Sequence, residues 1–123
     1  MGDRQILLVV DDESSILDLI KSFLENNYDI IITNDAIDAI KRSRDHKIDL
    51  LIADINMPAM SGKELSTKIR KMNHRVKVLY ISGNISDSVI DKADVDSDFD
   101  YIEKPFTRKE LIEKVENLLN SWF

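Results

Sequence analysis

Four consecutive apolar residues, 50–53, run directly into the carboxylate of Asp54. An uninterrupted apolar run of this length, closed by a turn signal, is typical of a strand that is buried on both faces. Pro58 supplies the turn signal, because the residue before a proline is disfavoured in the helical region. Ser61 then begins a new element, and Glu64 three residues later completes a capping box for a helix. This stretch therefore predicts an interior strand, with Asp54 at the point where the strand leaves the core.

Short apolar segments alternate with amphipathic segments along all 123 residues. Strands are predicted at residues 6–10, 28–33, 48–53, 76–81 and 99–103. Helices are predicted after a cap at Ser14 or Ser15, after Asn34 or Asp35, at residues 62–72, at residues 87–95, and after a capping box formed by Thr107 and Glu110. Aspartates crowd the second half of the segment 87–95, where the helix dipole disfavours anions, so we expect this helix to be short and mobile.

Strands and helices that alternate through short links favour right-handed crossovers and a parallel sheet with helices on both faces. We therefore expect a doubly wound α/β fold, with five strands and five helices, in a single domain over residues 1–123. Each helix should bury one apolar stripe, and these stripes include Ile37 in the second helix and Met72 in the third.

Composition excludes several classes of protein. The net charge is −6, with 23 acidic residues against 17 lysines and arginines, and no basic stripe supports binding to nucleic acid. The chain has no cysteine, which excludes disulfides and thiolate metal sites and fits a reducing compartment. No apolar run approaches the roughly 18–20 residues of a membrane-spanning helix, and no signal peptide precedes the first strand. We expect a cytoplasmic protein that binds no membrane.

Polar residues stand where the predicted strands end. Asp11 and Asp12 follow the first strand, Asp54 the third, Ser82 the fourth and Lys104 the fifth. All strands of a parallel sheet end at the same edge, and ligands bind outside that edge. In the sheet order 2-1-3-4-5 the first and third strands are neighbours, about 4.8 Å apart. The three aspartates would then share one pocket.

Three carboxylates in one pocket raise one another's pKa unless a proton or a cation joins them. A hard cation that prefers a few oxygen ligands and keeps its waters is Mg²⁺. The charges of Mg²⁺ and Lys104 would together balance the three aspartates. One of the carboxylates could then attack an incoming phosphoryl group and form an aspartyl phosphate.

These residues make the chain resemble the receiver domains of two-component response regulators over nearly its whole length. The resemblance implies a flavodoxin-like fold with the strand order 2-1-3-4-5. Asp11 and Asp12 match the acidic pair that holds Mg²⁺ in the family, and Asp54 matches the aspartate that is phosphorylated. Asn56 stands where the family supplies a backbone carbonyl to the metal.

The resemblance also implies a conformational switch. Ser82 matches the hydroxyl that binds the phosphoryl group, and Tyr101 matches the aromatic residue that turns inward on activation. Lys104 matches the lysine that contacts the phosphoryl group and precedes a cis-proline, here Pro105. By this resemblance the partner is a sensor histidine kinase or a histidine phosphotransfer protein. The chain is then not an enzyme beyond its own phosphorylation and dephosphorylation, and its output surface surrounds residues 87–95, the last strand and the last helix.

Three other functions fit parts of the pattern. A Mg²⁺-dependent phosphatase with an aspartate nucleophile would need an Asp-x-Asp motif after the first strand, where this chain has Asp11, Asp12 and Glu13. A flavin-binding domain would need a phosphate cradle there, and the same three acids would repel a phosphate. A receiver that acts only as an unphosphorylated docking module would not need an intact acidic site. Turnover of a phosphomonoester or a yellow colour would identify the first two.

Overall fold

A computed structural model describes residues 4–83 and 98–120. Five parallel strands form one sheet in the order β2-β1-β3-β4-β5. They are β1 (Ile6–Val10), β2 (Asp29–Thr33), β3 (Leu50–Asp54), β4 (Lys77–Ser82) and β5 (Phe99–Glu103). The α/β fold and the flavodoxin-like strand order are therefore confirmed. The last two interior strands run one residue further than predicted, because Asp54 pairs with Ile81 and Ser82 pairs with Glu103.

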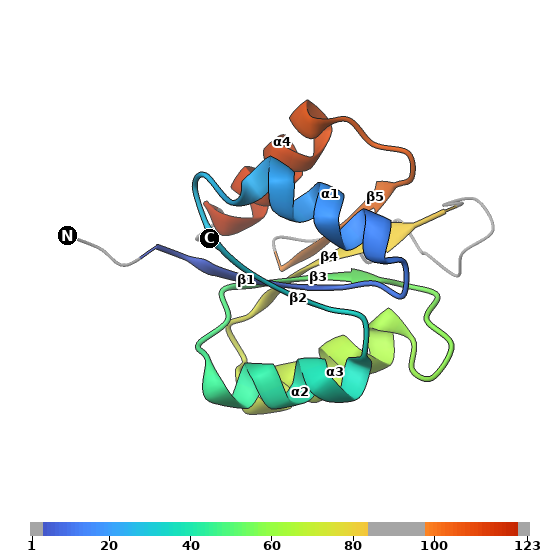
Figure 1. Cartoon of the computed structure of the whole chain (residues 1–123). Helices are drawn as coiled ribbons and strands as arrows, with labels where there is room; N and C mark the ends of the chain where they lie inside the picture. Colours follow the sequence, from blue (N-terminus) through green and yellow to red (C-terminus); the bar gives the residue numbers. More distant parts are fainter. Residues whose placement is uncertain (1–3, 84–97, 121–123) are drawn as a thin grey trace.

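Helices cover both faces of the sheet. α1 (Ser14–Leu24) and α4 (Arg108–Leu119) lie on one face, and α2 (Ala36–Asp45) and α3 (Gly62–Met72) lie on the other (Figure 1). The helix predicted at residues 87–95 lies outside the described residues. Among the described helices, none is both long enough and apolar enough to cross a membrane.

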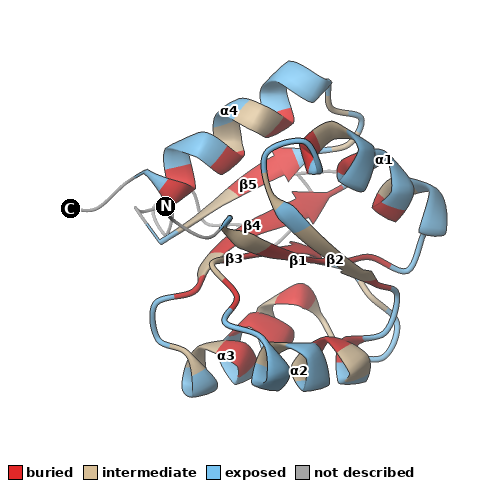
Figure 2. Ribbon diagram, turned by 60° about the vertical axis from the view of Figure 1, so that its left-hand side comes forward, coloured by how far each residue is buried: buried red, intermediate tan, exposed pale blue. Residues whose placement is uncertain are grey.

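The core consists of two apolar layers, one on each side of the sheet. Side chains along a strand point alternately to the two faces, so Leu7 and Val9 join the layer under α1 and α4, while Leu8 and Val10 join the layer over α2 and α3. β3 and all but the first residue of β1 and β4 are buried on both faces (Figure 2). β2 at the sheet edge is mainly half-buried, which matches its more mixed sequence.

Local hydrogen bonds explain where most helices begin. Asp35 caps α2 by accepting a bond from the backbone of the second helical residue, and Thr107 and Glu110 form the predicted capping box of α4. The prediction of a serine cap for α1 is wrong. The helix begins at Ser14 with Glu13 at the N-cap position, and the Glu13 side chain makes no capping bond.

Two residues of the predicted apolar stripes are exposed. The exposed fraction is 53% for Ile37 and 42% for Met72. Ile37 follows the buried Ala36 and is therefore rotated by about 100° around the helix, away from the stripe. Met72 is the last residue of α3, where the helix ends.

Candidate functional site: an acidic cluster at the carboxyl edge of the sheet

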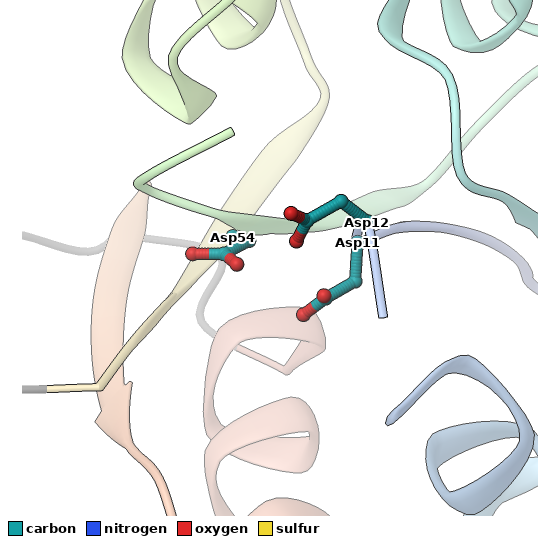
Figure 3. Close-up of side chains that lie close together, drawn as sticks. All are labelled: Asp11, Asp12 and Asp54. Atoms are coloured by element: carbon teal, nitrogen blue, oxygen red, sulfur yellow. The ribbon is translucent and has the colours of Figure 1, made fainter. Parts of the chain in front are cut away.

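The backbone ladder of the sheet brings three aspartates together. β1 ends at Val10, which pairs with Ala53 of β3, so Asp11 and Asp54 follow paired positions on neighbouring strands. Asp11, Asp12 and Asp54 each offer a carboxylate oxygen, and these atoms all lie within 4.8 Å of one another (Figure 3). The cluster that the strand-end pattern predicts is present in the structure.

Backbone contacts hold Asp54 at the end of β3. Its side chain is almost fully buried, and Oδ1 accepts a hydrogen bond of 3.0 Å from the backbone N–H of Asn56. The backbone N–H of Gly62 donates to the carbonyl of Ile55 over 3.0 Å and draws the start of α3 against this loop. A Cβ atom at Gly62 would lie only 2.5 Å from the carbonyl oxygen of Asp54, so this approach requires a glycine.

Lys104 completes the cluster from the end of β5. Its Nζ lies 3.3 Å from Oδ2 of Asp11, 3.5 Å from Oδ2 of Asp54 and 3.4 Å from Oε1 of Glu13. The backbone N–H of Lys104 donates to the carbonyl of Ser82 over 2.8 Å, which fixes where the side chain starts. The peptide bond between Lys104 and Pro105 is cis.

Glu13 is the site residue that the sequence reasoning did not include. Besides facing Lys104, it donates its backbone N–H to Oδ1 of Asp11 over 2.8 Å. Its position directly after the two aspartates was the available signal. Glu13 lies three residues beyond the end of β1, close enough to reach the same edge of the sheet.

The electrostatics of the cluster favour a cation. Asp11 is fully buried, and its Oδ2 accepts no hydrogen bond from any residue in the described part of the chain, although Lys104 lies at ion-pair distance. Burial raises the pKa of Asp11 above its usual value, against the opposing effects of the Glu13 N–H and Lys104. Burial alone would lower the pKa of Lys104, but the charges of Asp11 and Asp54 outweigh burial and raise it. Asp12 and Glu13 lie beside Asp11 and Asp54, so the site has four carboxylates and Lys104 supplies one positive charge.

A divalent ion with hard oxygen ligands fits these residues. The donor set consists of carboxylate oxygens, and the exposed Asp12 leaves the cluster open to solvent on one side. Proteins typically bind Mg²⁺ at open sites of this kind, through one or two carboxylates, and the ion keeps several of its waters. Oδ2 of Asp11 is the strongest individual indication, because this buried oxygen accepts no hydrogen bond from the described residues and has only the ion pair with Lys104 to offset its charge.

The structure places the two predicted switch residues on adjacent strands. Ser82 is the last residue of β4 and is fully buried. Tyr101 lies in β5, pairs with Tyr80 of β4 and is 5% exposed. The Tyr101 ring is stacked on the Tyr80 ring with the ring centroids 5.3 Å apart. Tyr101 therefore points into the protein in this structure.

The fold and the site together define a doubly wound α/β domain with an acidic cluster that could hold a metal ion, and a lysine beside it, at the carboxyl edge of the sheet. The family model described as "Response regulator receiver domain" matches residues 7–116, and the chain belongs to this family. Receiver domains are the phosphoacceptor switches of two-component signalling, and the chain is one of them.

Similar proteins agree with this assignment. The chain is 32% identical over 92% of its length to the alkaline phosphatase synthesis transcriptional regulatory protein PhoP of Bacillus subtilis, and covers 48% of that protein. It is 36% identical over 99% of its length to the regulatory protein VanR of Enterococcus faecium, and covers 52% of that protein. The chain thus spans about half the length of these relatives. A CheY-like receiver domain protein from Methanospirillum hungatei has a TM-score of 0.82 and 30% identity, with 96% of this chain and 95% of that chain covered.

Proposed function

We propose that this domain accepts a phosphoryl group on Asp54 and that Mg²⁺ is required for the transfer. The observation that carries the proposal is the position of the Asp54 carboxylate, within 3.5 Å of Lys104 and inside a cluster of carboxylates that can hold a cation. On this proposal, the carboxylate that accepts the phosphoryl group lies beside the groups that would neutralise its charge.

In the proposed reaction, a carboxylate oxygen of Asp54 attacks the phosphorus atom of a phosphohistidine. The new O–P bond forms while the N–P bond breaks, and the electron pair leaves with the imidazole nitrogen of the donor. Asp11, Asp12 and Asp54, together with the backbone carbonyl of Asn56, would hold Mg²⁺, which neutralises charge on the phosphoryl oxygens. Lys104 supplies a second positive charge beside Asp54.

Ser82 and Tyr101 are the proposed readout of phosphorylation. The Ser82 hydroxyl would bind the new dianion, and Tyr101 would fill the space beside it. This change would bias the output surface between two conformations, and of that surface the structure describes β5 and α4, while residues 87–95 lie outside the described residues. Ser82→Ala is the control for this step, because it changes no charge, removes the hydroxyl that would bind the phosphoryl group and leaves the Asp54 carboxylate in place.

The phosphoryl donor is proposed to be a sensor histidine kinase or a histidine phosphotransfer protein. Membership of the receiver family supports this donor class. The family match over residues 7–116 also supports one receiver domain within residues 1–123, and the lack of cysteine supports a cytoplasmic location. On this proposal the chain turns over no external substrate and removes only its own phosphoryl group.

The experiment measures intact mass after incubation with Mg²⁺ and acetyl phosphate, a small donor that needs no partner. We expect a gain of one phosphoryl group per chain that depends on Mg²⁺ and is absent in Asp54→Asn. Asp38→Asn is the matched control, because it makes the same carboxylate-to-amide change on α2, at a residue that pairs with Arg42 and is not part of the acidic cluster. Stoichiometric labelling of Asp54→Asn would overturn the assignment of the acceptor. Turnover of a phosphomonoester by the wild type would instead favour the phosphatase alternative.

A further inference from the structure

Three aromatic side chains form a compact group on the face of the sheet that carries α2 and α3. Tyr80 and Tyr101 pair across β4 and β5, and their rings are stacked with an interplanar angle of 28°. Phe99 meets both rings edge-on, with its centroid 6.0 Å from Tyr80 and 5.9 Å from Tyr101. Stacked and edge-to-face pairs at these distances are favourable beyond the area that they bury.

The Tyr80 ring is also fixed at its far end. Its hydroxyl lies 2.7 Å from Oγ of Ser66, which in turn lies 2.9 Å from the carbonyl oxygen of Lys63. A serine hydroxyl carries a single hydrogen, and here that hydrogen is directed to the carbonyl of Lys63. The Tyr80 hydroxyl is therefore the donor and Ser66 the acceptor. Ser66 and Tyr80 are both buried, so this hydrogen bond is shielded from water.

This short network begins beside the phosphoacceptor loop. Lys63 follows Gly62, the residue whose backbone packs against Asp54 at the start of α3. From there the bonds run through Ser66 to Tyr80, and the ring stack continues to Tyr101. Ser66, Tyr80 and Tyr101 are buried, and the bond between Ser66 and Lys63 is partly buried.

The position of Tyr80 relative to Ser82 adds a second argument. The two residues are separated by one position on β4, so their side chains leave the same face of the strand. A residue that only filled the core at this point would need no hydroxyl, and a buried hydroxyl costs free energy unless it is bonded. The hydrogen bond from Tyr80 to α3 and its stacking on Tyr101 therefore fix the position of the Tyr80 ring more closely than core packing alone requires.

We propose that Tyr80 is the positioning residue that holds Tyr101 in its inward conformation, and that Ser66 fixes the Tyr80 ring for this role. The proposal rests on the proposed function, because it takes Tyr101 as the residue that responds to phosphorylation. The stack stabilises the inward conformation only, so its loss moves the equilibrium toward an outward Tyr101. An aromatic pair changes the ratio of the two conformations by roughly two- to tenfold.

The test uses the full chain labelled with 3-fluorotyrosine and observed by fluorine NMR. The chain has three tyrosines, and any substitution of Tyr80 leaves the signals of Tyr101 and Tyr28. Tyr28 packs against the apolar layer on the opposite face and serves as an internal reference. In Tyr80→Met, which keeps an apolar side chain and removes the ring, we expect the Tyr101 resonance to shift or split. Tyr80→Phe keeps the ring and should displace it much less.

Ser66→Ala provides an independent variant that leaves every ring in place. It removes the acceptor of the Tyr80 hydroxyl, so we expect a small displacement of the Tyr101 resonance in the same direction as in Tyr80→Met. Combining it with Tyr80→Phe should add almost nothing, because both changes break one hydrogen bond. Ser43→Ala is the matched control, since Ser43 makes a comparable bond to a carbonyl three residues earlier, on α2. A Tyr101 resonance that stays at the wild-type position in both Tyr80→Met and Ser66→Ala would overturn the proposal.

Phosphorylation separates this inference from the function on which it rests. After labelling with acetyl phosphate and Mg²⁺, confirmed by intact mass, the Tyr101 resonance of Tyr80→Met should return toward the wild-type position. If Tyr80→Met gains the phosphoryl group and its Tyr101 signal does not move, the positioning role is wrong. If the wild type takes no phosphoryl group, the proposed function is wrong, while the spectra without donor still decide whether Tyr80 holds Tyr101.

Discussion

Gly62 offers the sharpest test of how the phosphoacceptor loop is built. Replacing it with alanine would normally stabilise a helix by up to about 1 kcal/mol, because alanine loses less conformational freedom than glycine. Here the new Cβ atom would lie 2.5 Å from the carbonyl oxygen of Asp54 and 3.2 Å from the Cα atom of Ile55. Both contacts are with backbone atoms, which cannot rotate away as the tip of a flexible side chain can.

The magnitude follows from the overlap. The start of α3 must move away from the loop by about 0.5 Å or more, and overpacking of this kind typically costs about 1–3 kcal/mol. The clash therefore outweighs the gain in helix propensity, and we expect Gly62→Ala to lower the free energy of unfolding by about 1–2 kcal/mol. The same displacement moves Asp54 relative to Lys104, so labelling by acetyl phosphate should slow as well.

Urea unfolding followed by circular dichroism measures the first effect, and the initial rate of mass gain measures the second. Gly83→Ala is the control, because a Cβ atom at that glycine meets no described atom within 4 Å. Gly62→Ala that is as stable as the wild type, with an unchanged rate of labelling, would refute the reasoning from close approach. Loss of stability in both variants to the same extent would show instead that glycine freedom, and not the clash, is what matters.

Three further predictions concern the charged groups. Hydrogen bonds from Thr107, the N-cap residue of α4, lower the pKa of Glu110. The capping box therefore contributes fully to the free energy of unfolding above pH 4.5, and this contribution is lost as the pH falls below that value, so Glu110→Gln should flatten the pH dependence of the unfolding free energy in the acidic range. Asp11→Asn should raise the unfolding free energy at pH 7 by roughly 0.5–2 kcal/mol and abolish the increase in Tm caused by Mg²⁺, whereas Asp38→Asn should retain that increase. Glu13→Gln should change the labelling rate less than about fivefold, because exposed ion pairs are weak, whereas Lys104→Met should slow labelling far more.

The sequence predicted most of the fold because its patterns are local and consistent. Interior strands such as residues 50–53 are continuous apolar runs, and the turn residues and caps fall between the runs. Strand order came from the family resemblance, since nothing local distinguishes one neighbour of a parallel strand from another. The ends of two strands were predicted one residue too early, because hydrogen-bond pairing continues through a polar residue, Asp54 in β3 and Ser82 in β4.

The same distinction explains which parts of the site were predictable. Asp11, Asp12 and Asp54 could be placed at one edge because they end strands of one parallel sheet, and in one pocket because the strand order implied by the resemblance makes β1 and β3 neighbours. The bond between Tyr80 and Ser66 could not be anticipated in this way. It joins a strand to the helix that precedes it, and neither residue type nor spacing signals a contact between two side chains buried in the core.

The structure also shows why this fold can carry an unfavourable site. Asp11 is fully buried beside other acids, and burial raises its pKa, so the ionised cluster lowers the stability of the protein at neutral pH. The cluster stands at the end of β1 and β3, whose apolar residues are buried on both faces and whose backbone positions are fixed by pairing on both sides. The sheet supplies the rigidity that keeps the carboxylates from moving apart. The backbone cannot move to separate the carboxylates, so their mutual repulsion is reduced when a cation binds between them.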